Sequence, residues 1–168
     1  IEMRAVYLAM VSRLDHQFGL LKKKLKECNL YDDTSIFVFS DHGDYTGDYN
    51  IAEKVQNCFE NCVVNVPLIL KPAKQFEVQP RISKALVELV DITATVEEMT
   101  GVKTEYVHFG KSLVHCLAGD EVHIPQAKPL KIGRFVNLDK SSKGLIQHIC
   151  KIFPTSVFST GKRNKFTG

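Results

Sequence analysis

The chain has 168 residues, of which 44% are hydrophobic and 24% are charged, which is enough for one domain with a hydrophobic core. Its formal net charge is +3, well short of the dense basic face with interleaved aromatic residues that is typical of nucleic-acid binding. No apolar stretch approaches the roughly 20 residues of a membrane span, so neither nucleic acid nor a membrane is expected as a partner.

The start of the chain and its cysteines bear on compartment. The first residue is Ile1 rather than Met and no signal peptide follows, so we interpret the sequence as a fragment. The five cysteines form no dense framework, and an odd number favours a reducing compartment such as the cytoplasm. Because the start is missing, localisation stays unknown. Cys58 and Cys62 lack the Cys-x2-Cys spacing of zinc sites and are interpreted as structural thiols.

The first predicted element is an amphipathic helix over about residues 3–28. Apolar side chains recur along it every three or four residues, and lysines fill the opposite face. The apolar positions are Met3, Tyr7, Met10, Leu14, Phe18, Leu21 and Leu25. Asn29 is a suitable stop signal, because asparagine tolerates the left-handed backbone that often ends a helix.

Two apolar strands are predicted next. Residues 35–40 lack polar alternation, which indicates a strand buried on both faces, as in a parallel sheet covered by helices. A glycine-containing loop follows over residues 41–53. Residues 63–70 form the second predicted strand, and Pro67 within it indicates an edge strand or a strand start, because proline lacks a backbone N–H.

The rest of the chain continues the alternation. The remaining predicted elements are helices over residues 81–90, 91–101 and 110–119, a strand over residues 131–138 and a helix over residues 141–153. Asp91 is predicted as an N-cap and Gly101 as a stop. Helices alternating with buried strands indicate an α/β fold, in which ligands collect at the carboxyl ends of the strands.

Asp41 and His42 follow the first predicted strand directly. If the backbone bends there, both side chains can reach one ion, and Gly43 permits a sharp turn. A carboxylate with an imidazole suits Zn, Mn or Fe, whereas an oxygen-only set favours Ca or Mg. The other interpretation is a hydrogen-bonded turn at a strand end, because Ser, Asp and Gly are ordinary turn residues.

A series of short motifs occurs in a fixed order over roughly residues 5–118. They are the helix from Tyr7 to Gly19, Thr34, Ser40-Asp41-His42-Gly43-Asp44, Gly47-Asp48, Lys54, Phe59-Glu60, Val66-Pro67-Leu68-Ile69, Val90 to Thr95, and Gly110-Lys111-Ser112-Leu113. In this order and spacing, the motifs resemble those of the sulfatase family of the alkaline phosphatase superfamily.

The resemblance implies a metal-dependent sulfuric ester hydrolase with an alkaline-phosphatase-like sandwich, in which helices flank a mixed, mostly parallel sheet. It implies that Asp41 and His42 are metal ligands and that Lys54 is a catalytic residue on the sulfate oxygens. A fixed cation and a lysine would stabilise the charge that develops there. The family favours Ca, while His42 leaves Mn or Zn open. The implied substrate is a sulfate ester, either a small molecule or a glycan.

The sequence also departs from the family. The Cys/Ser-x-Pro-x-Arg motif that matures to formylglycine is absent, as are the paired N-terminal Asp ligands, so the nucleophile is expected upstream and not in this chain. Asn65 stands where many members carry Arg. We therefore interpret residues 1–120 as the C-terminal part of a sulfatase-like catalytic domain and residues 121–168 as an unmatched segment, a small subdomain. The resemblance gives no role to His108, His115, His123 and His148.

Three functions follow as hypotheses. The first is a sulfatase in its intact form, with the fragment inactive alone. The second is a phosphodiesterase or phosphonate monoester hydrolase of the same superfamily, and the third is a non-catalytic sulfatase-like or binding domain. A homo-oligomer also stays open, because a fragment of a sheet would expose apolar surface.

Overall fold

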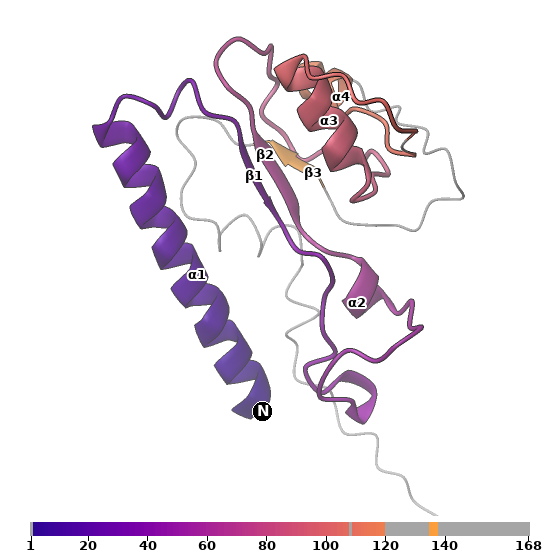
Figure 1. Cartoon of the computed structure of the whole chain (residues 1–168). Coiled ribbons are helices and arrows are strands. Elements are labelled where there is room, and N and C mark those ends of the chain that lie inside the picture. The colour runs from indigo at the N-terminus through magenta and orange to yellow at the C-terminus, as the bar shows by residue number, and fades with distance from the viewer. Residues whose placement is uncertain (1, 108, 120–134, 138–168) are drawn as a thin grey trace, which may run out of the picture.

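The computed structural model describes residues 2–107, 109–119 and 135–137 (Figure 1). Its elements are α1 (Glu2–Glu27), β1 (Ile36–Phe39), the 3-10 turn η1 (Asp48–Asn50), α2 (Asn61–Val64), β2 (Leu68–Lys71), α3 (Asp91–Thr100), α4 (Val114–Ala118) and β3 (Phe135–Asn137). The strands form one sheet in the order β1-β2-β3, with β1 and β2 antiparallel and β2 and β3 parallel. Helices with a mixed sheet agree with the predicted α/β class.

Helix α1 forms where the apolar periodicity predicts it. It ends as predicted at Asn29, whose φ of 56° lies in the left-handed region, and the N–H of Leu30 donates to the carbonyl of Leu25 across the end. No residue of α1 is buried within the described part of the chain, and Leu14 and Leu21 are more than half exposed. The apolar stripe of this helix is therefore uncovered by the residues that the structure describes.

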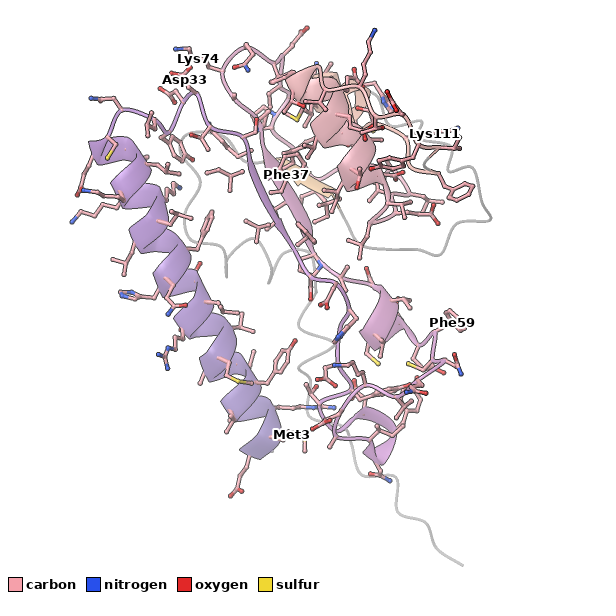
Figure 2. All side chains as sticks on the ribbon, viewed as in Figure 1. Met3, Asp33, Phe37, Phe59, Lys74 and Lys111 are labelled. Carbon is pink, nitrogen blue, oxygen red and sulfur yellow. The ribbon has the colours of Figure 1, made fainter. Side chains whose placement is uncertain are left out.

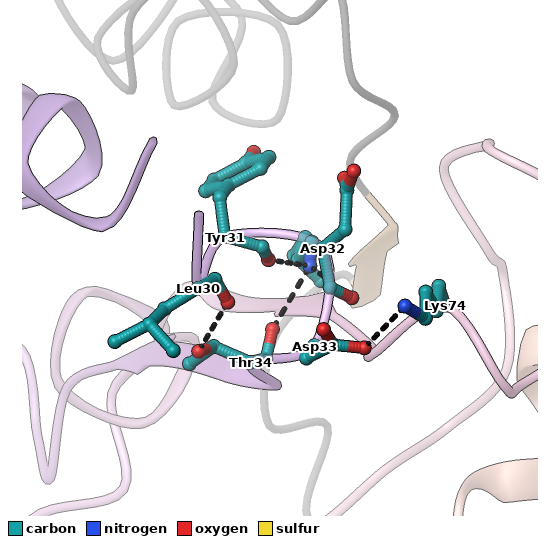
Figure 3. Close-up of polar contacts among 7 residues, drawn as sticks. Leu30, Tyr31, Asp32, Asp33, Thr34 and Lys74 are labelled. Atoms are coloured by element: carbon teal, nitrogen blue, oxygen red, sulfur yellow. Dashed lines mark hydrogen bonds and ion pairs between the residues drawn. The ribbon is translucent and has the colours of Figure 1, made fainter. Parts of the chain in front are cut away.

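The turn between α1 and β1 is held by a buried lysine from the central strand. The ammonium group of Lys71 donates to the carbonyls of Tyr31 and Thr34, at 2.9 Å for Thr34, and lies 4.6 Å from the centre of the Tyr31 ring. On the outside of the same turn, Lys74 pairs with Asp33 at 2.9 Å (Figure 3). A lysine on β2 thereby connects the end of α1 to the sheet, because its charge is shared among backbone acceptors.

Among the residues that the structure describes, strand β1 lies at the edge of the sheet rather than in its interior. Its residues are half-buried or exposed, and Phe39 is 49% exposed. The prediction of a strand buried on both faces within a parallel sheet is therefore wrong in this respect: the only described partner of β1 is β2, and that pairing is antiparallel. Phe37 alternates inward and packs against the core (Figure 2).

Strand β2 is the central strand, and all four of its residues are buried. It begins directly after Pro67, which confirms the predicted strand start, since the missing N–H of proline falls outside the ladder. The predicted strand over residues 63–70 is too long at its start, because Val63 and Val64 lie in α2. Leu68 and Leu70 form the core with residues of α4 and of the segment before α3.

The segments on both sides of α3 differ in part from prediction: the helix predicted over residues 110–119 forms only over Val114–Ala118, which is α4. Gly101 ends α3 with a φ of 71°, as predicted. Residues 81–90 form no helix, so that prediction is wrong: they are irregular chain with isolated bridges. Ala85 and Val87 are nonetheless buried against β2. This burial explains why the segment is apolar although it forms no helix.

Two of the recognised motifs meet at Asp91. Its carboxylate is 1% exposed and accepts hydrogen bonds from the backbone N–H of Glu88 and of Lys111, both at 2.8 Å. A Cβ on Gly110 would lie 2.0 Å from the carbonyl oxygen of Val90, so only glycine permits this approach. Asp91 is thus no N-cap, because Val90 occupies that position; its side chain ties α3 to the segment before α4.

Other predictions fall on the C-terminal quarter. The strand predicted over residues 131–138 is confirmed over Phe135–Asn137, which form β3, and its remaining residues lie outside the described part of the chain. The helix over residues 141–153, and the division at residue 120 into two parts, lie outside the described residues, as do His108, His123 and His148. Across the described ranges, no helix has both the length and the apolar character needed to cross a bilayer.

Candidate metal-binding site

The candidate site lies where the chain leaves β1. After Phe39 the backbone bends through Ser40 to Gly43, and the N–H of Gly43 donates to the carbonyl of Val63 at 2.7 Å. This bond brings α2 against the bend. The sequence explains the close approach, because a side chain at Gly43 would collide with the backbone of α2: a Cβ there would lie 2.0 Å from the carbonyl oxygen of Cys62.

Asp41 and His42 lie side by side at this bend. Oδ1 of Asp41 accepts the backbone N–H of His42 at 2.9 Å, and Oδ2 lies 3.7 Å from Nε2 of His42. Nδ1 of His42 lies 2.8 Å from the carbonyl oxygen of Gly43. The hydroxyl of Ser40 donates to the carbonyl of His42 at 2.6 Å.

The arrangement of donors and acceptors fits a cation. The Gly43 carbonyl can only accept, so its contact with Nδ1 of His42 is a hydrogen bond when Nδ1 carries the proton, and in a neutral ring of that form Nε2 presents a lone pair. That lone pair and Oδ2 of Asp41 are two acceptors 3.7 Å apart, an arrangement that repels unless a positive charge lies between or beside them. A proton on the ring or a divalent metal ion would supply that charge.

The pair is open to solvent and offers two candidate ligands. The side chain of Asp41 is 83% exposed and that of His42 is 38% exposed. Within the described ranges, no group of three or more His, Cys, Asp or Glu side chains is arranged to hold a metal. A complete coordination sphere therefore needs oxygen or nitrogen ligands beyond this described set, from polypeptide or from water.

Lys54 is exposed in the loop between η1 and α2. Among the residues that the structure describes, no hydrogen bond or ion pair connects it to Asp41 or His42. The structure thus brings together the two predicted metal ligands but not the predicted lysine, whose role stays a prediction.

A polar cluster behind the bend was not anticipated from the sequence. Tyr45 is 3% exposed, and its hydrogen bond with the side chain of Cys58, followed by burial, raises the pKa of its hydroxyl above the ordinary 10.0. Burial, followed by the charge of Asp48, raises the pKa of the Cys62 thiol above 9.0. Because these contacts join residues from different segments of the chain, the local sequence pattern carries no signal for them.

An ion pair ties the loop after the bend to the start of α1. The guanidinium of Arg4 pairs with the carboxylate of Asp48 and also donates to the carbonyl of Thr46 at 3.3 Å. Burial, followed by the charge of Asp44, raises the pKa of Tyr7 on the same helix. The loop that follows Asp41 and His42 is therefore held from two sides, by α1 and by α2.

A surface cavity among the described residues lies elsewhere. It has a volume of about 410 Å³ and is lined by Lys26, Asn29, Tyr31, Asp32, Asp33 and Lys74. These residues belong to the end of α1 and the turns beside the opposite end of β1, so this cavity is separate from the bend that carries Asp41 and His42.

Comparison with known proteins agrees with the motifs. Residues 1–102 match the family described as Sulfatase. The chain belongs to the sulfatase family. It is 32% identical over 117 residues to the multifunctional alkaline phosphatase superfamily protein PehA of Trinickia caryophylli, a match that covers 70% of this chain and 22% of that protein. It is also 32% identical over 121 residues to choline-sulfatase of Rhizobium meliloti (strain 1021), covering 70% of this chain and 23% of that protein.

Membership of the sulfatase family confirms the resemblance drawn from the motifs and agrees with the α/β class. The family match reaches from the start of α1 just past the end of α3, so it includes the bend with Asp41 and His42 and also Lys54. The chain spans less than a quarter of the length of these two relatives. The activity of a whole protein of this kind is therefore a matter of proposal.

Proposed function

We propose that the intact sulfatase-family protein hydrolyses sulfate esters with the help of a divalent metal ion, and that this chain supplies part of the metal site. The observation that carries the proposal is the pairing of Asp41 Oδ2 with His42 Nε2 at 3.7 Å, at the end of a strand within the family match. Two acceptors held so close are suited to one shared cation.

Each residue has a separate task in this proposal. Asp41 and His42 bind the ion, which when bound would stabilise negative charge on the transferred sulfuryl group. Lys54 contacts the sulfate oxygens and balances the charge of the leaving group. For that, the exposed loop that carries Lys54 must approach the bend when substrate binds.

In this proposal, the nucleophile is not supplied by this chain. The sequence contains no Cys/Ser-x-Pro-x-Arg motif, so we expect formylglycine in polypeptide upstream of these residues. The 168-residue chain should then be inactive alone. An isolated chain that cleaved an aryl sulfate as fast as an intact sulfatase would refute this part of the account.

Two considerations point to different metal ions. The family favours calcium, which prefers oxygen ligands. The imidazole of His42 suits manganese or zinc better. Binding of each ion to the full-length protein, measured by calorimetry on chelator-treated samples, would separate the two.

A phosphodiesterase or phosphonate monoester hydrolase is the second candidate, because one relative is named a multifunctional protein of the alkaline phosphatase superfamily. The test is a parallel assay of the full-length protein with an aryl sulfate and an aryl phosphodiester. The proposal expects the higher kcat/KM for the sulfate, a small molecule or glycan ester being the natural substrate class. A preference for the phosphodiester would select the second candidate.

A further inference from the structure

We propose that Ser40 and the contact between Gly43 and Val63 are positioning elements that hold His42 in the tautomer with its proton on Nδ1, so that Nε2 faces the metal site. The use of this tautomer for metal binding rests on the proposed function. The tautomer itself rests only on the hydrogen bonds around the bend.

The first element is the hydroxyl of Ser40. It donates to the carbonyl of His42 at 2.6 Å, across a bend of two residues. This bond fixes the peptide between His42 and Gly43, which directly precedes the Gly43 carbonyl that the imidazole must reach. A serine hydroxyl that closes a tight bend in this way gives the backbone a hydrogen bond outside the strand ladder.

The second element is α2. The N–H of Gly43 donates to the carbonyl of Val63 at 2.7 Å, and the approach is close enough that a Cβ on Gly43 would lie 2.0 Å from the carbonyl oxygen of Cys62. Gly43 is therefore pinned on its N–H side by an element 20 residues further along the chain. Its own carbonyl is left to face the ring of His42.

The third step is the tautomer. Nδ1 of His42 lies 2.8 Å from the carbonyl oxygen of Gly43, and this contact is a hydrogen bond only when Nδ1 carries the proton. Free imidazole side chains in water prefer the proton on Nε2, so the bend selects the less common form. A histidine ligand to a metal is commonly oriented by a hydrogen bond from its second nitrogen to a carbonyl, which is the relationship seen here.

Neither Ser40 nor Val63 would touch a metal or a substrate. They act through the backbone of Gly43. The hydroxyl and the α2 carbonyl hold the His42–Gly43 peptide from both sides, and the Gly43 carbonyl that follows this peptide selects the tautomer. The tautomer leaves Nε2 beside Oδ2 of Asp41, 3.7 Å away. Because the ligand pair is oriented before an ion arrives, less of the binding free energy is lost in ordering the two side chains.

The test is the tautomer of His42 in the metal-free 168-residue chain. Nitrogen-15 NMR at about pH 9, where histidine side chains are ordinarily neutral, distinguishes the protonated from the unprotonated ring nitrogen. The signals of His42 are assigned by their loss in His42→Gln. We expect Nδ1 to carry the proton, and a ring with its proton mainly on Nε2 would overturn the proposal.

Ser40→Ala tests the positioning role, with Thr34→Val as the matched control. Thr34 also donates a hydroxyl to a backbone carbonyl, that of Leu30 at 2.7 Å, at the other end of β1. One lost hydrogen bond should lower the ratio of the Nδ1-protonated to the Nε2-protonated form by about fivefold. The control should leave the ratio unchanged; no change in Ser40→Ala, or an equal change in both variants, would contradict the role of Ser40.

Manganese separates this proposal from the proposed function. Added Mn²⁺ should broaden the ring signals of His42 in the wild-type chain, and more weakly in Ser40→Ala. The predicted tautomer without any broadening would support the positioning elements and count against the metal site. Broadening of a ring with its proton on Nε2 would support the metal site and overturn the positioning elements.

Discussion

Replacement of Asp91 by alanine should destabilise the chain more than any surface substitution. The carboxylate is 1% exposed and accepts two backbone N–H groups, those of Glu88 and Lys111, each at 2.8 Å. A hydrogen bond to a charged group contributes about 1.5–3 kcal/mol, so we expect the loss of both to lower the free energy of unfolding by about 3–6 kcal/mol. Single domains have about 5–15 kcal/mol in total, and the variant should therefore be close to unfolded.

Urea unfolding followed by circular dichroism measures this loss. Asp91→Asn keeps one acceptor oxygen and should lose roughly half as much as Asp91→Ala. The control is Asp33→Ala, which removes an exposed ion pair with Lys74 at 2.9 Å and should cost under about 1 kcal/mol. If Asp91→Ala and Asp33→Ala unfolded at the same urea concentration with the same slope, the argument from the buried carboxylate would be refuted.

Three further predictions concern the turn after α1 and the cluster behind the bend. Lys71→Met should leave the carbonyls of the turn over residues 31–34 without their ammonium donor and lower the unfolding free energy by about 3 kcal/mol, measured in urea; an unchanged midpoint would contradict it. The raised pKa of Tyr45 means that the unfolded chain releases this proton first, so stability should fall as pH rises above 10.0. Tyr45→Phe should reduce that fall in urea titrations at about pH 9 and about pH 11, and an identical fall would argue against it. Iodoacetamide should modify exposed Cys28 before Cys62, whose pKa is raised, as followed by peptide mass spectrometry; the reverse order would contradict this.

The parts of the fold that the sequence predicts are those set by local chemistry. The apolar spacing locates α1, the left-handed backbone at Asn29 and Gly101 ends α1 and α3, and the missing N–H of Pro67 marks the start of β2. Each of these signals acts within a few residues of the chain, so no knowledge of distant contacts is needed.

The errors come from contacts between distant segments. An all-apolar strand is compatible with the interior or the edge of a sheet, and only the pairing with β2 places β1 at the edge of the sheet formed by the described residues. Residues 81–90 have helix-compatible apolar spacing, but Ala85 and Val87 are buried against β2 in irregular chain. Tertiary packing outweighs local preference in both places.

The candidate site was predictable only in part, because some of its contacts also join distant segments of the chain. Asp41 and His42 are adjacent in sequence and carry a motif, so they could be identified without the structure. The contact from Val63 to Gly43 spans 20 residues and depends on the absence of a Cβ. The sequence shows the glycine but not which distant residue approaches it. The approach of Lys54 to the pair is a further long-range relationship, and it stays a prediction.

Metal content of the full-length protein tests the central claim most directly. Elemental analysis of purified wild type, Asp41→Ala and Asp44→Ala would compare a proposed ligand with a neighbouring carboxylate that accepts the N–H of Tyr45 at 2.9 Å. The account predicts one divalent ion per chain in wild type and Asp44→Ala, and its loss in Asp41→Ala. Full metal content in Asp41→Ala, or none in wild type, would contradict it.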